Sequence, residues 1–391
     1  MKNVKIFAQT IEAEAKKQIE KMAASEAYRD CQIRIMPDCH AGKGCTIGTV
    51  IQTAGRVVPN TVGVDIGCGM LVFQLNKKDI NLSLLDRIIN DNIPSGFSVH
   101  DNPIPEAAGR KIHRILRGLD RITGGCFDRS YMERSLGTLG GGNHFIELDE
   151  DDEGYKYLVV HSGSRNLGVK VCNYFQELAQ KNVNRSGERK RIIEEYKKLG
   201  IESEINNALR RLGTIPPDLA YLEGESLYSY LFAMQGCQEF ACANRWEIAA
   251  TILRELQVWF LDSFTTAHNY LDVDTGIIRK GAVCAEKYQQ LIIPLNMRDG
   301  SLICRGKGNE DWLYSAPHGA GRLMSRAKAK ETLSMDEYSK EMQGIYSTSV
   351  CESTIDESPM AYKSAEEIES LIGDTVEIVK RIKPIYNFKA K

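Results

Sequence analysis

The sequence has no long apolar run, and this absence limits where the protein can act. Its 391 residues include no apolar stretch long enough for a signal peptide or a membrane span, and residues 1–24 carry lysines in an amphipathic pattern. The formal net charge is only −2, so no global basic field attracts nucleic acid. We therefore expect a cytoplasmic protein without membrane contact, in which any RNA or DNA would bind to a local patch.

The cysteines lack the pattern of a disulfide framework. There are eleven, an odd number, and nothing indicates export, so we expect reduced thiols that are available to a metal. A zinc site made of Cys39, His40 and Cys45 is conceivable, but paired C-x-x-C spacing is missing. A glycine-rich loop that supports other site residues or contacts an anion fits this stretch better. His100 and His113 stand without companions and indicate surface or capping roles.

Internal repeats and low-complexity tracts are also missing. With 42% hydrophobic and 26% charged residues, the chain has the composition of an ordinary globular protein, and its length allows two or three domains or one large one. Short strands alternate with helical patterns, which predicts mixed α and β structure. Charged helical periodicity from about residue 169 to 264 predicts a helical insertion. Its cationic residues fit either a solvated helix face or a track for a phosphate backbone.

The glycine-flanked stretch at residues 62–69 places an acid and a thiol three residues apart. Gly63, Gly67 and Gly69 can take backbone angles closed to other residues, so the chain can bend until Asp65 and Cys68 converge. We expect an apolar strand to enter this loop from position 57 and another to leave it from position 70. Two convergent anionic groups suggest a cation, although a structural cysteine beside a turn-forming aspartate is the simpler interpretation of an isolated D-x-x-C.

Four of the seven histidines lie at glycine-flanked strand or loop ends. They are His144, His161, His268 and His318. The first three, with Asp65 and Cys68, make five candidate ligands, and catalytic metal sites commonly keep three protein ligands per ion. If the Cys68 thiolate bridges two ions, each ion has three ligands. Such metal pairs, roughly 3.5–4 Å apart, suit phosphoryl or nucleotidyl transfer.

His318 is left over from this count and has a different setting. It lies in Ser315–Arg322, which we expect to open a helix, and backbone N–H groups at a helix start with Arg322 behind them would bind phosphate. A histidine beside a phosphate can act as a nucleophile if the attacking nitrogen is unprotonated. A capping histidine is the alternative.

At this point the chain resembles the RtcB-type RNA ligases. Six stretches carry the resemblance, in the family's order and over nearly the whole length: PDCHAGKGCTIG from Pro37, VGVDIGCGM from Val62, LGGGNHFIEL from Leu139, VVHSGSRNLG from Val159, the HNY turn from His268, and SAPHGAGRLMSR from Ser315. The resemblance implies a GTP-dependent and manganese-dependent ligase that joins an RNA 3′-phosphate or 2′,3′-cyclic phosphate to a 5′-hydroxyl, in RNA repair or tRNA splicing. It also implies an α+β fold with a single large catalytic domain over residues 1–391.

The resemblance also implies roles for individual residues. One Mn²⁺ falls on Cys68, His161 and His268, and the other on Asp65, Cys68 and His144, while His318 is the residue that becomes guanylylated. The GTP contacts fall on Asn143, Glu147, Ser301, His318, Ala320, Gly321 and Lys389. Arg165 would contact the phosphate of the RNA end. The family's chains usually end in Lys-Gly, whereas Lys389 is followed here by Ala390 and Lys391, which weakens the assignment of Lys389. The thiol and imidazole ligands alone favour zinc, so manganese comes from the resemblance.

Two other functions fit part of the same pattern. A metal-dependent phosphodiesterase or cyclic-phosphate hydrolase that uses no nucleotide explains Asp65, Cys68 and the three histidines equally well, but leaves His318 without a role. A non-catalytic RNA-end binding protein with a structural metal is the third possibility, and open coordination positions argue against it. The sequence identifies neither the physiological RNA nor an activating protein partner.

Overall fold

A computed structural model describes residues 3–105, 107–183, 186–212 and 215–390 of the chain. Helices and strands are mixed along its length, which confirms the predicted α+β class. Within these residues no helix is both long enough and apolar enough to cross a membrane. The expectation of a cytoplasmic location stays a prediction.

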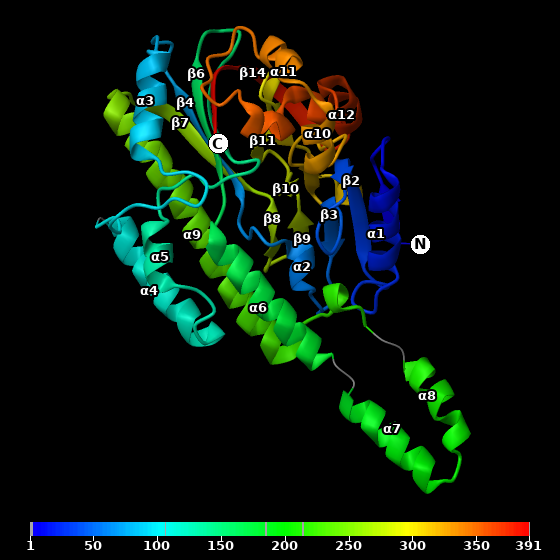
Figure 1. Cartoon of the computed structure of the whole chain (residues 1–391). Coiled ribbons are helices and arrows are strands. Elements are labelled where there is room, and N and C mark those ends of the chain that lie inside the picture. Colours follow the sequence, from blue (N-terminus) through cyan, green and yellow to red (C-terminus); the bar gives the residue numbers. More distant parts are fainter. Residues whose placement is uncertain (1–2, 106, 184–185, 213–214, 391) are drawn as a thin grey trace.

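A seven-stranded antiparallel sheet forms the centre of the molecule (Figure 1). Its spatial order is β11 (Gln290–Asn296), β12 (Gly300–Gly306), β14 (Val376–Lys389), β5 (Phe145–Glu150), β6 (Lys156–Ser162), β4 (Gly69–Leu75) and β7 (Phe260–Ala267). Successive side chains of a strand point to opposite faces, and in β4 both faces are buried. Leu71 and Phe73 pack in one apolar cluster, whereas Met70 and Val72 pack in another. This explains why the residues from Met70 to Phe73 are all apolar.

Two smaller sheets lie beside the large one. The five-stranded sheet has the order β1 (Val4–Ile6), β2 (Gln32–His40), β3 (Ile47–Gln52), β9 (Ile277–Lys280) and β8 (Asn269–Asp272). Only its β1–β2 pair is parallel. A two-stranded sheet joins β10 (Ala282–Cys284) to β13 (Ser315–Pro317). Strands β7 and β8 are almost continuous in sequence, so they connect the large sheet to the five-stranded sheet.

Helices cover the sheets and fill the space between them. They are α1 (Ala13–Ala23), α2 (Pro59–Val62), α3 (Leu82–Asn92), α4 (Ala107–Thr123), α5 (Arg129–Arg134), α6 (Asn166–Asn182), α7 (Ser186–Lys198), α8 (Ile205–Leu212), α9 (Gly224–Leu256), α10 (Arg326–Thr332), α11 (Met335–Glu341) and α12 (Ala365–Ile372). The described residues also form five single-turn or two-turn 3₁₀ segments: η1 (Glu202–Glu204), η2 (Pro217–Leu219), η3 (Glu310–Trp312), η4 (Glu352–Glu357) and η5 (Pro359–Ala361). Ser325, Ser334 and Ser364 cap the N-termini of α10, α11 and α12 by accepting a hydrogen bond from a backbone N–H.

Helix α9 is the longest element and joins two apolar cores. Its first half contributes Tyr230, Met234 and Phe240 to the largest core, where α4 and α6 also pack. Its second half contributes Ile248 and Ile252 to the core beneath β4 and β5. Because one rigid helix belongs to both cores, it fixes the position of α4 and α6 relative to the large sheet.

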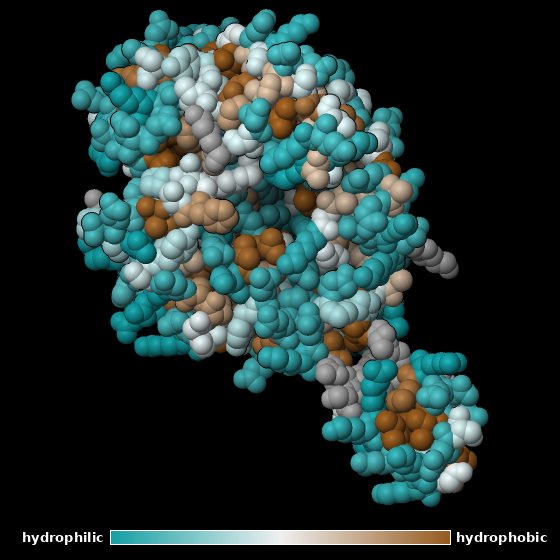
Figure 2. Space-filling view, viewed as in Figure 1, coloured by the Kyte–Doolittle hydropathy of each residue, from teal (hydrophilic) through white to brown (hydrophobic). Residues whose placement is uncertain are grey.

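The segment predicted as a helical insertion contains two kinds of helix. Helices α6 and α9 are part of the core, while α7 and α8 project from the main body (Figure 1) and carry apolar surface (Figure 2). The helical stretch ends at Leu256, so the prediction of helix up to residue 264 is wrong there: the β-branched and aromatic residues of β7 pair with β4 instead. Residues 184–185 and 213–214 of this segment lie outside the described residues. That the whole segment is an insertion stays a prediction.

The strand expected to enter the Asp65–Cys68 loop is also corrected. Pro59 begins the short helix α2 after Val58, and Gly63 follows it with a φ of 109°. Proline at the first helical position has no backbone N–H to lose, which favours a helical turn over a strand here. The strand that leaves the loop begins at Gly69, close to the predicted position.

We expect Phe240→Ala to destabilise the fold by about 3–5 kcal/mol, since it removes a fully buried ring from the core shared by α4, α6 and α9. The midpoint of urea unfolding, followed by circular dichroism, measures this effect. Phe232→Ala on the same helix is the matched control, because Phe232 is 57% exposed, and its effect should stay within about 0.5 kcal/mol. Equal effects of the two substitutions would contradict the position of α9.

Candidate active site

Four neighbouring strands deliver the five candidate ligands to one end of the large sheet. In the register, Met70 of β4 pairs with His161 of β6, and His161 also pairs with Phe145, the residue after His144. Gly69, the residue after Cys68, pairs with Ala267, the residue before His268. The side chains therefore converge because the strand ends are aligned by their hydrogen bonds, although they are far apart in sequence.

The ligand atoms form two overlapping groups. Cys68, His161 and His268 make one group, and Asp65, Cys68 and His144 make the other, with the ligand atoms of each group within 4.8 Å of one another. The Cys68 Sγ lies 3.3 Å from Nε2 of both His144 and His161. The Nε2 atoms of His161 and His268 are 3.3 Å apart, and His144 Nε2 is 3.0 Å from Asp65 Oδ2. Cys68 belongs to both groups, which is the arrangement that the sequence predicts if its thiolate bridges two ions.

The hydrogen bonds of the histidines leave lone pairs pointing into the cluster. Nδ1 of His144 lies 3.1 Å from the carbonyl of Leu139, and Nδ1 of His161 lies 3.0 Å from the carbonyl of Asn143. A carbonyl only accepts, so each Nδ1 carries the proton and each Nε2 of the neutral ring is an acceptor. Acceptor atoms this close to one another repel unless a cation lies between them. The donor set of this cluster therefore fits a metal ion. Metal-binding histidines are commonly oriented in this way, by a hydrogen bond from the other ring nitrogen to a backbone carbonyl.

Burial favours the neutral forms of His161 and His268 and of the Cys68 thiol. Removal from water lowers the pKa of His161 and His268 well below the usual value, and the neighbouring histidines lower it further. Burial raises the pKa of Cys68 well above its usual value, with a further contribution from Asp65. A bound cation would reverse this balance for the thiol, because metal binding displaces its proton.

Helix α9 supports the cluster from behind with two buried polar side chains. Arg245 donates from Nη1 to the carbonyls of Gly67 (3.0 Å) and Ser162 (2.8 Å), and so joins the Asp65–Cys68 loop to the end of β6. Asn244 accepts from the N–H groups of Gly137 and Thr138 and donates to Ser162 Oγ. The sequence pattern did not identify either residue, because both lie among many other polar and charged residues of a long helix and belong to no motif.

His318 stands next to this cluster and is oriented by a buried aspartate. Its ring centre is 4.8 Å from that of His268, and its Nδ1 lies 2.6 Å from Oδ2 of Asp38, which is fully buried. The same carboxylate oxygen accepts a hydrogen bond from the His318 backbone N–H. When the ring is neutral, Nδ1–H donates to Asp38 and the lone pair lies on Nε2. We expected the stretch around residues 37–45 to support other site residues, and Asp38 does so by contacting His318 directly.

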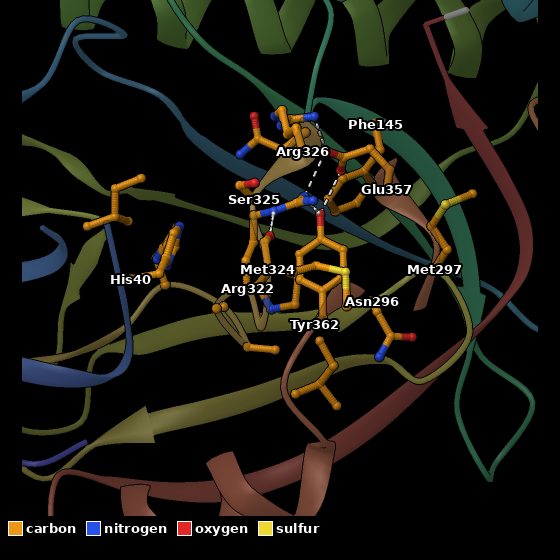
Figure 3. Close-up of a pocket in the computed structure, with 18 of the residues that line it drawn as sticks. His40, Phe145, Asn296, Met297, Arg322, Met324, Ser325, Arg326, Glu357 and Tyr362 are labelled. Atoms are coloured by element: carbon orange, nitrogen blue, oxygen red, sulfur yellow. Dashed lines mark hydrogen bonds and ion pairs between the residues drawn. The ribbon is translucent and has the colours of Figure 1, made fainter. Parts of the chain in front are cut away.

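A cavity of about 690 Å³ opens beside His318 (Figure 3), and it is large enough for a nucleotide-sized ligand. Of the seven residues predicted to contact GTP, six line this cavity: Asn143, Glu147, His318, Ala320, Gly321 and Lys389. Ser301 is not among the lining residues; it is buried on β12, opposite Ile382 of β14. Figure 2 shows a hollow near the middle of the main body. The roles of these residues as nucleotide contacts stay predictions.

The loop after His318 differs from the predicted helix start. Residues 315–317 form β13, and the next helix, α10, begins only at Arg326. Gly321 has a φ of 78°, which a helix does not allow, and a Cβ at this position would overlap the backbone of Asp38. A helix N-terminus at residues 318–322 is therefore excluded, and Arg322 reaches the cavity from a loop.

Comparison with known proteins decides the family. The family model described as "tRNA-splicing ligase RtcB" matches residues 18–124 and 126–390. The chain belongs to the RtcB family. It is 33% identical to the RNA-splicing ligase RtcB of Escherichia coli K12, over 96% of this chain and 94% of that protein. It is 27% identical to the tRNA-splicing ligase RtcB of Aeropyrum pernix and 26% identical to that of Nanoarchaeum equitans, in both cases over 90% of this chain and 86% of the relative.

This RtcB-family chain has a charged group at the cavity that the sequence pattern missed. Buried Glu357 from η4 bonds to Lys389 Nζ at 3.0 Å and pairs with Arg322 and Arg326 (Figure 3). Burial alone would raise the pKa of Glu357, but Lys389 and Arg326 outweigh it and hold that pKa at about 2. The short helical turn that carries Glu357 has no recognisable motif, so only the fold could have revealed it.

Lys389 has a defined position at the end of β14. Its backbone pairs with Phe145 at the end of β14, its N–H donates to Ser349 Oγ at 2.9 Å, and its side chain is buried. Lys391 lies outside the described residues. The contacts of Lys389 come from the strand and from Glu357, so the unusual residues after it are not needed to hold it.

Arg165 follows the end of β6 and is bonded to two neighbouring loops. Its Nε donates to Thr138 Oγ1 at 2.8 Å and its Nη2 donates to the Gly96 carbonyl at 2.7 Å. Its backbone has a φ of 58° and a ψ of −148°, a conformation almost confined to glycine. A Cβ placed on Gly140 would overlap both Arg165 Nη1 and His144 Nδ1, so the guanidinium lies close to the cluster.

We expect Gly163→Ala to disturb one half of the cluster, because a Cβ at Gly163 would overlap the carboxylate of Asp65. Mn²⁺ affinity at the Asp65–Cys68–His144 group should fall roughly 10-fold or more, as for residues that position metal ligands, while the other group keeps its ion. Electron paramagnetic resonance titration with Mn²⁺ measures both. Gly187→Ala, where a Cβ meets open space, is the control; two unchanged sites in Gly163→Ala would refute the grouping.

Proposed function

We propose that this RtcB-family protein is an RNA ligase that joins a 3′-phosphate or 2′,3′-cyclic phosphate end to a 5′-hydroxyl end, with GTP as cosubstrate and two Mn²⁺ ions. Membership of a family of splicing ligases supports RNA ligation and places the reaction in tRNA splicing or RNA repair. GTP, manganese and the chemistry of the ends are the proposal's finer parts, and they rest on the resemblance of the motifs together with the geometry of His318.

The position of His318 carries the proposal. This histidine lies between a metal-ligand cluster and a nucleotide-sized cavity, and a buried carboxylate fixes its Nδ1. A neutral imidazole oriented in this way presents Nε2 as a nucleophile, which is the arrangement that nucleotidyl transfer through a histidine needs. A hydrolase that uses no nucleotide would have no use for the cavity or for the Asp38 contact.

Three nucleotidyl steps follow from this arrangement. Nε2 of His318 attacks the α-phosphorus of GTP, an N–P bond forms, and the P–O bond to pyrophosphate breaks. An oxygen of the RNA 3′-phosphate then attacks the same phosphorus, and His318 leaves with its electron pair. Last, the 5′-hydroxyl attacks the RNA phosphorus of the resulting anhydride and expels GMP. A cyclic phosphate end first needs water to open it to a 3′-phosphate.

The surrounding residues would bind and orient the reactants. Arg322 and Arg326 supply positive charge at the cavity, and Asp38 holds His318 in the reactive tautomer. Glu147 faces the cavity with a pKa of about 7, raised by burial and opposed by Lys389, and its carboxylate form suits the N–H donors of guanine. The Asp65, Cys68, His144, His161 and His268 set would hold the two cations, which neutralise charge on the transferring phosphoryl oxygens.

The identity of the metal rests on a different argument from the identity of its ligands. Cysteine and histidine donors bind zinc more tightly than manganese, so the donor set itself does not select Mn²⁺. Manganese follows from the resemblance to the family, and a comparison of Mn²⁺ with Zn²⁺ in the labelling reaction below separates the two.

Incubation with Mn²⁺ and α-³²P-GTP should label the protein covalently, and His318→Ala should abolish the label, because the proposed phosphoramidate forms on Nε2 of His318. Denaturing gel electrophoresis with autoradiography measures the label. His113→Ala is the matched control, since that histidine is exposed and pairs with Glu133, and it should be labelled like the wild type.

The outcome also decides between the ligase and its main rival. An unlabelled wild-type protein that still opens a 2′,3′-cyclic phosphate would support the nucleotide-independent hydrolase. A protein that binds RNA ends but does neither would support the non-catalytic binding protein. Labelling with Zn²⁺ but not with Mn²⁺ would overturn the assignment of the metal.

Loss of the shared ligand should differ from loss of an unshared one. We expect His161→Ala to lose one of two Mn²⁺ ions and Cys68→Ala to lose both, because only Cys68 belongs to both groups. Isothermal titration calorimetry gives the stoichiometry, and ligation of a labelled RNA gives the rate. Cys172→Ala, which removes a buried thiol from the core, should keep two ions. Ligation at the wild-type rate in Cys68→Ala would contradict the shared-thiolate arrangement.

A further inference from the structure

One large apolar side chain is presented to solvent on a turn that is linked to the metal-ligand cluster through Arg165. Phe97 lies in the loop between α3 and α4 and is 95% exposed, the highest value among the large apolar side chains of the described residues. Exposure of a single apolar residue is common and needs no explanation by itself. The surroundings of Phe97 are what give its exposure a meaning.

The backbone beneath Phe97 is held firmly. Residues 95–98 form a turn in which Ser98 N–H donates to the Ser95 carbonyl and Gly96 has a φ of 63°. Gly96 N–H donates to the Gly140 carbonyl at 2.8 Å, and Tyr131 Oη from α5 donates to the Phe97 carbonyl at 3.0 Å. The ring is therefore displayed by a fixed turn, so its exposure is a property of the folded structure.

The same turn is bonded directly to the candidate anion-binding residue. Arg165 donates from Nη2 to the Gly96 carbonyl, one residue before Phe97. Its Nη1 has no hydrogen-bond partner among the described residues, and a Cβ added at Gly140 would meet both this nitrogen and Nδ1 of His144. One short chain of contacts thus leads from the metal-ligand cluster through Arg165 to Phe97.

This placement suits the end of a broken RNA strand. At a break, the terminal base has lost the stacking neighbour on one face, and an aromatic ring can replace that neighbour. Single-stranded RNA is commonly bound in this way, with the base stacked on an aromatic side chain and the phosphate held by a cation. Stacking is tolerant of sequence because every base has a π-face, which suits an enzyme that must join many different ends.

We propose that Phe97 is a positioning residue that stacks on the terminal nucleobase of the RNA strand whose 3′-phosphate is held by Arg165. The inference rests on the proposed ligase function and adds a base contact to it. The base is fixed by the ring while the phosphate reaches the cluster, so the terminal nucleotide is held at both ends. Phe97 does not touch the nucleotide cavity, and guanylylation of His318 does not need it.

The test measures binding of a fluorescent RNA oligonucleotide with a 3′-phosphate to the full-length protein in Mn²⁺, by fluorescence anisotropy. A second oligonucleotide is identical except for an abasic 3′-terminal nucleotide. We expect Phe97→Ala to weaken binding of the first roughly 5- to 150-fold, the range found for a base stacked on an aromatic side chain. The abasic oligonucleotide should bind equally to the wild type and the variant, because neither complex can stack.

Two matched variants separate stacking from other effects. Phe97→Trp keeps an aromatic ring on the same turn and should restore binding. Trp259→Ala removes an 84% exposed aromatic side chain that precedes β7, at the end of β4–β7 remote from the cluster, and should bind RNA like the wild type. Labelling of each variant with GTP reports that the protein is folded and that the cavity is intact.

Each result decides the proposal. Equal binding of the base-bearing oligonucleotide by wild type and Phe97→Ala overturns it, as does an equal loss with the abasic oligonucleotide. The proposal is also overturned if Phe97→Ala weakens the binding only of an oligonucleotide that ends in a 5′-hydroxyl, since the ring would then stack on a base of the other strand. A wild-type protein that takes no label from GTP rejects the proposed function instead, so the two failures are distinguishable.

Discussion

The hydrogen-bond register of β5, β6, β4 and β7 is the constraint on which the site depends. The five candidate ligands come from four segments spread over about half of the chain, and only the alignment of strand ends brings them together. Successive residues of a strand face opposite sides, so a shift of β6 by one residue would turn His161 away from Cys68. Apolar residues on both faces of β4 resist such a shift, because it would exchange every contact in two cores.

The same convergence creates an electrostatic problem that a cation solves. The carbonyls of Leu139 and Asn143 accept hydrogen bonds from Nδ1–H of His144 and His161. The Nε2 atoms of these two rings, which face the cluster, therefore carry lone pairs and no proton. The one proton of the Cys68 thiol can serve only one of these two nitrogens, and a buried acceptor without a donor costs on the order of 1–3 kcal/mol in proteins. A fold that merely needed to be stable would place apolar residues at these positions. The cluster is retained against that cost, which is the physical argument for metal binding.

The sequence predicted the parts of the site that glycine and histidine mark. Glycines beside Asp65, Cys68, His144 and His161 indicated tight backbone, and the ligand count already implied a shared Cys68. Glu357, Asn244 and Arg245 could not be found in this way, because each lies in a helix or turn and acts only through long-range packing. The prediction of a strand from Val57 and that of a helix at Ser315 were wrong for the same reason. Proline and glycine near these positions are compatible with several turn conformations, and tertiary contacts select one of them. The α+β class could be predicted, whereas the order of strands could not.

Arg165 shows how a local cost indicates a role. Its φ of 58° and ψ of −148° fall in a region that is essentially restricted to glycine, and such a residue costs on the order of 1–3 kcal/mol. Glycine at this position would remove the strain, and the α6 helix that follows would lose nothing from its core. What glycine would lose is the guanidinium, which burial further disfavours by lowering its pKa. Strain and burial both oppose an arginine here, and its hydrogen bonds to Thr138 and Gly96 offset part of that cost. This half-buried arginine bonds the Phe97 turn on one side and adjoins His144 on the other, which is the placement that our proposal of an anion contact uses.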